Sequence, residues 1–233
     1  MIQLSEMVQA GMHFGHQARR WNPRMSPYIY GERNGVHIID LIQTHKYLTE
    51  ISEFVTEQTK QGKTFLFVGT KNQADELIQN YANQHDNVAY VNHRWLGGML
   101  TNWKTIRTSI NALNQYEKDE ASGQLARLPK KEAALKRQQQ ERLVTFLGGL
   151  KKMTRLPDIV VIIGQTEELN AVRECRKLGL RSITVLDTDC DPKLADLFIP
   201  ANDDSVTSID FILKTLSQAI TAGEQVKSEK AIS

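Results

Sequence analysis

Two stretches of the chain combine basic and aromatic side chains in a pattern that suits contact with nucleic acid. One lies between residues 13 and 33, and the other begins at Arg94 and runs past Trp103. Arginine binds phosphate oxygens with two parallel N–H groups and stacks on bases, and indole offers a stacking face and one N–H donor. The candidate RNA-binding residues of these stretches are His16, Arg19, Arg20, Arg24, Arg33, Arg94, Lys104 and Arg107.

The tryptophans have a second interpretation, because large aromatic rings are often mostly buried in protein cores. We expect at least two of Trp21, Trp95 and Trp103 to be packed inside the protein. The arginines are therefore the better candidates for RNA contacts.

The formal charge of +2 hides an uneven distribution of charge along the chain. Residues 104–155 carry twelve Lys and Arg against five acidic side chains, a net charge of +7, whereas residues 156–233 carry eight against thirteen. An excess of positive charge in one stretch favours binding to a phosphate backbone or an acidic surface. A pair of solvated helices with a lysine-rich face explains it equally well. Further basic candidates in this stretch are Lys130, Lys131, Lys136 and Arg137.

The chain lacks the sequence patterns of catalysis. We find no G-x-S-x-G turn, no HExxH motif and no obvious pair of catalytic carboxylates. The apolar run 64–68 is followed by Gly69, Thr70 and Lys71, which resembles half of a phosphate-binding loop without its second glycine. An ordinary turn from strand to helix is the favoured interpretation. We expect no catalytic residue, no cofactor and no enzyme activity.

Metal binding is not expected either. His13 and His16 are three residues apart, but a zinc site needs at least a third protein ligand, and the two cysteines lie far away in sequence. We expect these histidines to donate hydrogen bonds to backbone or phosphate. The alternating aspartates of residues 187–191 lack the glycine and glutamate of a calcium loop, so a turn is the favoured interpretation.

Strands and helices alternate along most of the chain, which predicts an α/β fold with a parallel sheet flanked by helices. The run 64–68 is apolar at every position, as in a strand buried on both faces. Residues 13–28 show no period but contain four large apolar side chains, so we expect an irregular segment lying against the core. Strands are expected at 36–39, 64–68, 88–91, 159–163, 182–186 and 197–199, and helices at 41–61, 72–84, 167–178 and 206–222.

Residues 103–155 interrupt this alternation. Apolar residues recur at helical spacing on both sides of a break that contains Pro129, which predicts an antiparallel helical hairpin with facing apolar stripes. We therefore expect residues 1–102 and 156–222 to form one α/β domain and residues 103–155 to form an inserted basic hairpin. Residues 223–233 lack an apolar period and are expected to be a disordered tail.

Length and composition exclude several protein classes. A chain of 233 residues with 40% hydrophobic and 24% charged residues is typical of a soluble globular protein. No run approaches the ~18 apolar residues of a membrane span, so neither a transmembrane helix nor a membrane partner is expected. The start shows no signal-peptide pattern, and we expect the two cysteines to be reduced thiols.

Four long motifs stand out in the chain. They are H-F-G-H-Q-A-R-R-W-N-P-R-M at 13–25, G-E-R-N-G-V-H-I-I-D-L at 31–41, N-H-R-W-L-G-G-M-L-T-N-W at 92–103 and I-P-A-N-D-D-S at 199–205. Together they resemble one known family, the second protein of the small ribosomal subunit (the S-two family). The resemblance runs in one order from a short helix expected at 4–11 to about residue 222, with a departure at Gly164-Gln165, where the family pattern suggests an aspartate.

The resemblance implies a flavodoxin-like parallel sheet with a helical hairpin insertion, and a structural role in the small ribosomal subunit. Expected partners are ribosomal RNA and neighbouring small-subunit proteins, among them the large mRNA-binding protein numbered one, and no homo-oligomer is expected. The sequence segments R-R-W-N-P and L-D-T-D-C-D-P are similar to those of the cyanobacterial and plastid members of this family. This implies a place in the chloroplast stroma as an organelle-encoded ribosomal protein, with the cyanobacterial cytoplasm as the alternative.

A flavodoxin-like enzyme or nucleotide-binding module is the competing hypothesis. Its site would lie beyond the carboxyl ends of strands 64–68, 88–91 and 159–163, where doubly wound sheets bind their ligands. A ribosomal protein sediments with the small subunit, and a free enzyme does not.

Overall fold

The computed structural model describes residues 2–122 and 129–232, with the backbone alone for 229–232. Five parallel strands form the central sheet: β4 (Phe65–Val68), β5 (Val88–Val91), β6 (Ile159–Ile162), β7 (Arg181–Leu186) and β8 (Leu197–Pro200). Their spatial order is β5-β4-β6-β7-β8. If these five strands are numbered 1 to 5 in chain order, their order in the sheet is 2-1-3-4-5, as in flavodoxin-like folds. The predicted α/β fold class is therefore confirmed.

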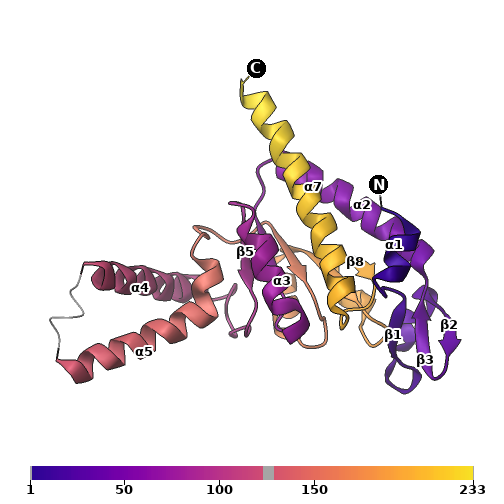
Figure 1. Cartoon of the computed structure of the whole chain (residues 1–233), viewed down its shortest axis with the longest axis horizontal. Coiled ribbons are helices and arrows are strands. Elements are labelled where there is room, and N and C mark those ends of the chain that lie inside the picture. The colour runs from indigo at the N-terminus through magenta and orange to yellow at the C-terminus, as the bar shows by residue number, and fades with distance from the viewer. Residues whose placement is uncertain (1, 123–128, 233) are drawn as a thin grey trace.

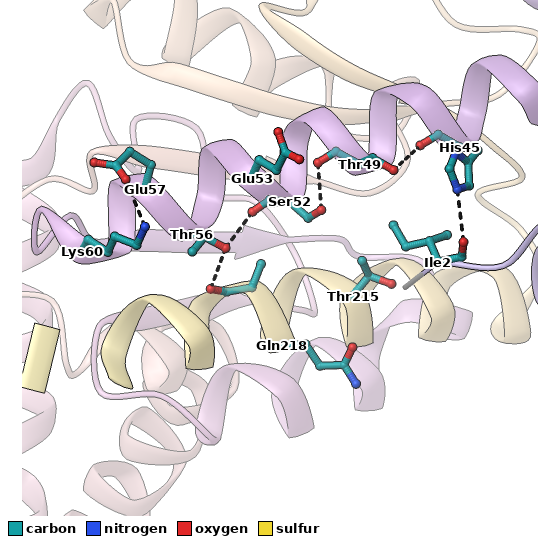
Figure 2. A pocket seen from close by; sticks show the side chains of 11 residues that line it. Ile2, His45, Thr49, Ser52, Glu53, Thr56, Glu57, Lys60, Thr215 and Gln218 are labelled. Carbon is teal, nitrogen blue, oxygen red and sulfur yellow. Dashed lines mark hydrogen bonds and ion pairs between the residues drawn. The ribbon is translucent and has the colours of Figure 1, made fainter. Parts of the chain in front are cut away.

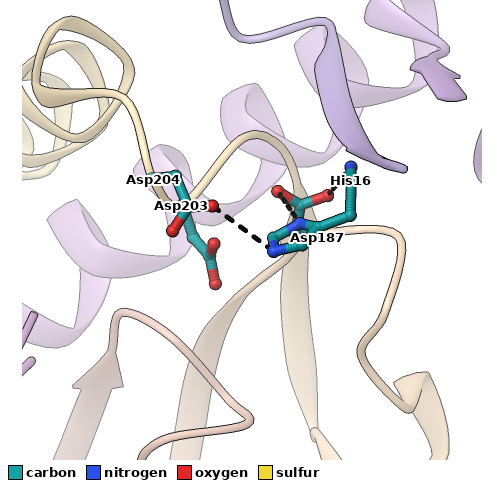
Figure 3. Close-up of side chains that lie close together, drawn as sticks. All are labelled: His16, Asp187, Asp203 and Asp204. Atoms are coloured by element: carbon teal, nitrogen blue, oxygen red, sulfur yellow. Dashed lines mark hydrogen bonds and ion pairs between the residues drawn. The ribbon is translucent and has the colours of Figure 1, made fainter. Parts of the chain in front are cut away.

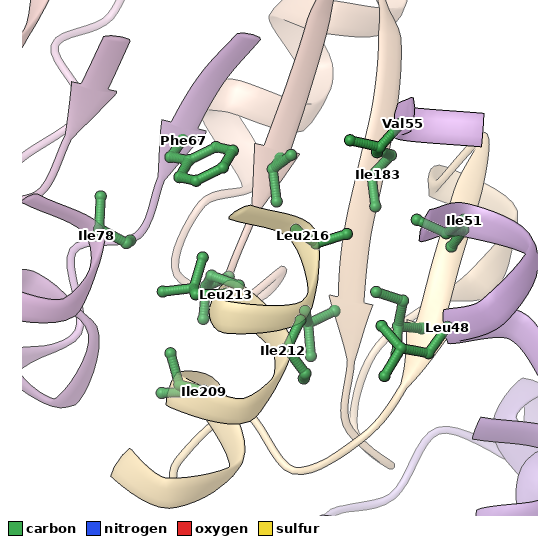
Figure 4. Packing of buried hydrophobic residues seen from close by; sticks show 14 of the residues in the cluster. Leu48, Ile51, Val55, Phe67, Ile78, Ile183, Ile209, Ile212, Leu213 and Leu216 are labelled. Carbon is green, nitrogen blue, oxygen red and sulfur yellow. The ribbon is translucent and has the colours of Figure 1, made fainter. Parts of the chain in front are cut away.

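Helices cover both faces of this sheet (Figure 1). One face is packed by α2 (Leu41–Lys60), α3 (Asn72–Asn83) and α7 (Val206–Ile232), whose apolar side chains meet Phe65 and Phe67 of β4 (Figure 4). The other face is packed by α6 (Leu169–Leu178) and by the segment after β5, which meet Leu66 and Val68. Strand β4 is therefore buried on both sides, as its unbroken apolar run predicts.

Local capping explains where several of these helices begin and end. The Asp40 carboxylate accepts a hydrogen bond from the N–H of Ile42 (2.9 Å), which fixes the start of α2. Gly179 ends α6 in the left-handed conformation, with φ +66°. None of the described helices has the length and apolarity needed to cross a membrane.

A small antiparallel sheet lies beside the first helix, α1 (Leu4–Gln9) (Figure 1). It consists of β1 (Phe14–Gln17), β2 (Ile29–Arg33) and β3 (Val36–Ile39) in the order β1-β3-β2, with the 3₁₀ turns η1 (Ala18–Arg20) and η2 (Pro23–Tyr28) between β1 and β2. The sequence did not predict β1 or β2. Both strands pair with β3 through register shifts, which break the two-residue alternation that reveals a strand.

The predicted helical insertion is present as α4 (Trp103–Ala121) and α5 (Lys130–Leu147), followed by η4 (Gly148–Leu150). We call α4 and α5 the arm, and Figure 1 shows it projecting from the sheet. Apolar residues join the two helices near the sheet, where Ile110, Leu113 and Leu147 are buried. Further from the sheet, the two helices are joined by a hydrogen bond that Gln140 Nε2 donates to the Glu120 carboxylate (2.8 Å). Leu135, on this part of α5, is 53% exposed. The apolar stripes thus face each other only near the base of the arm.

The C-terminal segment differs from the sequence expectation. Instead of becoming disordered after residue 222, the chain continues α7 to Ile232. Gly223 is buried against α2, where a Cβ atom would lie 2.7 Å from the carbonyl oxygen of Thr56. Glu224 reaches Nδ1 of His85 (3.2 Å). These contacts extend the helix through a glycine and polar side chains, which an apolar period does not detect.

Gly149 marks the point where the chain returns from the arm to the sheet. A Cβ atom there would lie 2.7 Å from Cδ2 of the Tyr90 ring and would also meet the Tyr90 carbonyl oxygen. We expect Gly149→Ala to lower the free energy of unfolding by about 1–3 kcal/mol, because the backbone must shift to make room. The measurement is chemical denaturation followed by circular dichroism.

Gly148→Ala is the matched control for this prediction. A Cβ atom at Gly148 meets Val144 Cγ1 at 3.8 Å, an ordinary contact. We expect this variant to be neutral or slightly more stable. Equal stabilities of the two variants would contradict the proposed contact at Gly149.

Candidate nucleic-acid interface

The structure divides the basic candidate residues into those paired with acids and those left free. The His16 ring lies between two carboxylates, with Nδ1 3.0 Å from Asp187 and Nε2 3.3 Å from Asp204. The Arg24 guanidinium pairs with Asp191. Both charges are thus balanced within the protein, and neither side chain offers a free cation to a phosphate.

Three other arginines form an exposed positive corner on the small sheet. Arg19, Arg20 and Arg33 are exposed, and the backbone N–H of Ala18 donates to the carbonyl of Gly35 (2.9 Å), which holds η1 beside the β2–β3 turn. Within the described residues no carboxylate pairs with these arginines, and Arg19 Nε reaches only the neutral amide of Gln17 (2.9 Å). We call these three residues the arginine corner.

The arm carries the larger set of free cations. Among the described residues, none of its candidates has an ion pair, and all are exposed except Lys136, which is half-buried. The same holds for Arg94, in the segment that leads into α4. The arm candidates are Lys104, Arg107, Lys130, Lys131, Lys136 and Arg137.

The arginine corner and the arm lie at opposite ends of the long axis of the molecule (Figure 1). The structure therefore does not bring the basic candidates together into one surface. It offers two separate positive surfaces. Between them lies the α/β domain, which is net acidic because residues 156–233 carry eight cationic against thirteen acidic side chains. A linear sequence gives no indication of this separation.

The tryptophans are mostly packed inside the protein. Trp95 is 7% exposed, and Trp103 is half-buried against the second face of the sheet. Trp21 is 38% exposed, with its ring edge-on to His37 at 5.1 Å between centroids. At least two of the three rings are thus packed, as the sequence predicts.

The carboxyl edge of the sheet, where doubly wound folds bind nucleotides, is occupied by the protein's own side chains. Glu168 accepts the backbone N–H of Thr70 (2.9 Å), which takes a donor that a phosphate would need. Lys71 Nζ is bound to Asp203 (2.7 Å) and Asp204 (2.9 Å). A phosphate at this edge would meet several carboxylates, so the nucleotide-binding hypothesis is disfavoured.

His16, Asp187, Asp203 and Asp204 lie close together at this edge (Figure 3), and Lys71 pairs with two of them. These contacts shift the pKa values of several members of the cluster. The hydrogen bond to Asp187 raises the pKa of His16 to about 9, against the opposing effect of burial. Burial and repulsion from Asp187 raise the pKa of Asp203. Burial opposes the charge of Lys71, but the attraction of Asp203 and Asp204 outweighs it, and the pKa of Lys71 is raised.

The same cluster has the ligand atoms of a cation site. His16, Asp187, Asp203 and Asp204 each place one such atom within 4.8 Å of the others, and Oδ2 of Asp203 is buried without a hydrogen-bond partner. Three carboxylates and one imidazole suit Zn²⁺ or Mn²⁺, and such an ion would compete with the His16 proton. The sequence interpretation missed this grouping because it paired His16 with His13, whose ring lies against Phe14 instead.

An open groove of about 640 Å³ lies between α2 and α7 (Figure 2). Its hydroxyl groups are bound to backbone carbonyls, for example Thr56 to Ala219 (3.1 Å) and Thr49 to His45 (2.8 Å). Glu53 also lines it. Glu57 and Lys60 line it as well, so the groove has no excess of positive charge and does not favour a polyanion.

Lys71 is the cation that keeps the carboxyl edge of the sheet together. Its side chain is 9% exposed and lies among Asp203, Asp204 and Glu167. We expect Lys71→Met to lower the free energy of unfolding by about 3–5 kcal/mol, because it leaves the buried carboxylate of Asp203 without its partner. Urea denaturation measures this.

Lys46→Met is the control, because Lys46 is 71% exposed and lies 4.0 Å from Glu50. Its loss should cost about 1 kcal/mol or less. If Lys71→Met were as stable as this control, the cluster would not have the structural importance inferred here.

The comparisons with known proteins agree with this geometry. Residues 7–223 match the family model of ribosomal protein S2. The chain is 61% identical to small ribosomal subunit protein uS2c of Oltmannsiellopsis viridis, over 98% of this chain and 96% of that one. Identity is 54% to uS2c of Chlorella vulgaris (96% and 83% covered) and 52% to uS2 of Picosynechococcus sp. (96% and 87%). The chain therefore belongs to the ribosomal protein S2 family in its plastid form, a structural and non-enzymatic constituent of the small ribosomal subunit.

Proposed function

We propose that this protein is held in the small subunit by two separate sets of RNA phosphates, one at the arm and one at the arginine corner. The observation that carries the proposal is the absence of acidic partners for these cations within the described residues, in a chain that pairs His16, Arg24 and Lys71 internally. The grooves of RNA duplexes are hard for side chains to read, so we expect contacts to the backbone and to irregular loops.

Neighbouring proteins are proposed to cover other parts of the surface. Leu4 and Val8, four residues apart on α1, are 45% and 51% exposed. Adjacent exposed apolar side chains on one helix face favour a protein contact over an RNA contact. The large mRNA-binding protein numbered one, a partner implied by the resemblance, is a candidate neighbour. We propose one copy of the chain in each particle.

The electrostatic contribution predicts a steep dependence on salt. If the two surfaces together contact about six phosphates, the log–log slope of affinity against salt concentration should be about −4 to −5. The measurement is filter binding of the purified protein to a small-subunit ribosomal RNA transcript between low and moderate salt. A slope near zero would contradict an electrostatic attachment.

Charge reversal tests the contribution of the arm. We expect simultaneous replacement of Lys130, Lys131, Lys136 and Arg137 by Glu to reduce incorporation into reconstituted small subunits and to make the salt slope shallower, by about one for each lost phosphate contact. Sedimentation in a sucrose gradient measures incorporation.

The matched control reverses four exposed cations elsewhere on the surface: Lys46, Arg176, Lys177 and Lys214. This variant has the same net charge as the arm variant, so a general charge effect would reduce both equally. Normal incorporation of the arm variant would show that the arm contacts neither RNA nor an acidic neighbour.

A further inference from the structure

The side chain of Glu174, on α6, is buried beneath the segment that leads into the arm. It is 9% exposed, and its two oxygens accept five hydrogen bonds from Trp95–Thr101. Oε1 accepts from the indole Nε1 of Trp95 (3.0 Å) and the N–H of Gly98 (2.8 Å). Oε2 accepts from the N–H groups of Leu100 (3.0 Å) and Thr101 (2.9 Å) and from the Thr101 hydroxyl (3.0 Å).

Glu174 is held by N–H and O–H donors, and no Lys, Arg or His of the described residues pairs with it. Burial alone would raise its pKa, but the hydrogen bonds from Thr101, Trp95, Gly98 and Leu100 outweigh this and lower it. The carboxylate is therefore charged at neutral pH. Its Oε2 faces N–H groups just before the first turn of α4, where the helix dipole also favours a negative charge.

The segment that Glu174 holds has no sheet or helix to position it. Residues 97–102 form turns, with Gly98 at φ +88°. The N–H groups of Met99 and Asn102 bind backbone carbonyls within these turns, whereas those of Gly98, Leu100 and Thr101 bind Glu174. The return segment from the arm is fixed differently, by the contact of Gly149 with Tyr90 and by the ion pair of Lys151 with Glu117. In the outgoing segment the buried side chains of Met99 and Leu100 contribute packing, and Glu174 is the side chain of α6 that binds its remaining N–H groups.

We propose that Glu174 is a positioning residue that fixes the direction of the arm relative to the sheet, and thereby the affinity of the arm for RNA. The second half of this statement rests on the proposed function. A helix pair joined to a body by two short segments is held in one direction only if both segments are fixed. Fixing it before binding reduces the ordering cost that RNA binding would otherwise include.

Glu174→Gln tests this with little change in side-chain size. The amide keeps one acceptor oxygen, but its NH₂ group faces two of the N–H donors, so both hydrogen bonds on that side are lost. Spin labels on cysteines introduced at Asn80 of α3 and Gln138 of α5, both exposed, report the direction of the arm by double electron–electron resonance. Cys175 and Cys190 are buried and should not react with the label.

We expect a narrow distance distribution in the parent protein and a broader or shifted one in Glu174→Gln. Thr101→Val, which removes one of the five hydrogen bonds without altering α6, should broaden it less. Glu168→Gln is the matched control, because Glu168 is another buried carboxylate that accepts a backbone N–H, that of Thr70, but does not contact the arm segment. Circular dichroism verifies that each variant is folded.

An unchanged distribution in Glu174→Gln, or equal broadening in Glu168→Gln, would overturn the inference.

For binding to the ribosomal RNA transcript, we expect Glu174→Gln to weaken affinity about tenfold with the same salt slope, because every arm cation is retained. A broadened distance distribution with unchanged affinity for the RNA transcript would overturn the claim that the direction of the arm affects RNA binding. Failure of the proposed function would look different: charge reversal in the arm would leave RNA binding unchanged, while the spin-label distances would still respond to Glu174.

Discussion

The requirement that a buried charge have a partner determines how this protein divides its charges. Several acidic side chains of residues 156–233 pair with cations of the α/β domain. Asp203 and Asp204 hold Lys71, Asp187 holds His16, and Asp158 holds Lys63 at 3.1 Å. The cations of the arm and the arginine corner have no such neighbours among the described residues. A net charge near zero thus coexists with two surfaces whose cations have no acidic partner among the described residues.

The cluster at the carboxyl edge of the sheet has a structural consequence as well. The backbone N–H of His16 donates to the Thr188 hydroxyl (3.0 Å), so the loop after β7 holds β1 by both main chain and side chain. The Asn22 N–H donates to the Thr188 carbonyl (2.8 Å). The edge that binds nucleotides in related architectures here fastens the small sheet, and with it the arginine corner, to the larger one.

The sequence predicts well what depends on local pattern. The apolar runs and glycine turns predict the five sheet strands and the helices between them, and the motifs predict the family. The pairing of β1 with β3, the contact of Gly223 with α2 and the grouping of His16 with Asp187, Asp203 and Asp204 depend on residues far apart in sequence. The pairing of β2 with β3 is local, but its register shift breaks the alternation of side chains. No periodicity reports such contacts. For the same reason, the sequence could nominate Arg24 as an RNA-binding residue but could not show its pairing with Asp191.

The central claim is that the free cations at both ends of this protein meet RNA phosphates in the particle. The most direct measurement is a cryo-electron-microscopy structure of the plastid small subunit at side-chain resolution. We predict the nitrogen atoms of Arg19, Arg33, Lys131 and Arg137 within hydrogen-bonding distance of phosphate oxygens. An arm surrounded by solvent, with no anionic group beside it, would contradict the account.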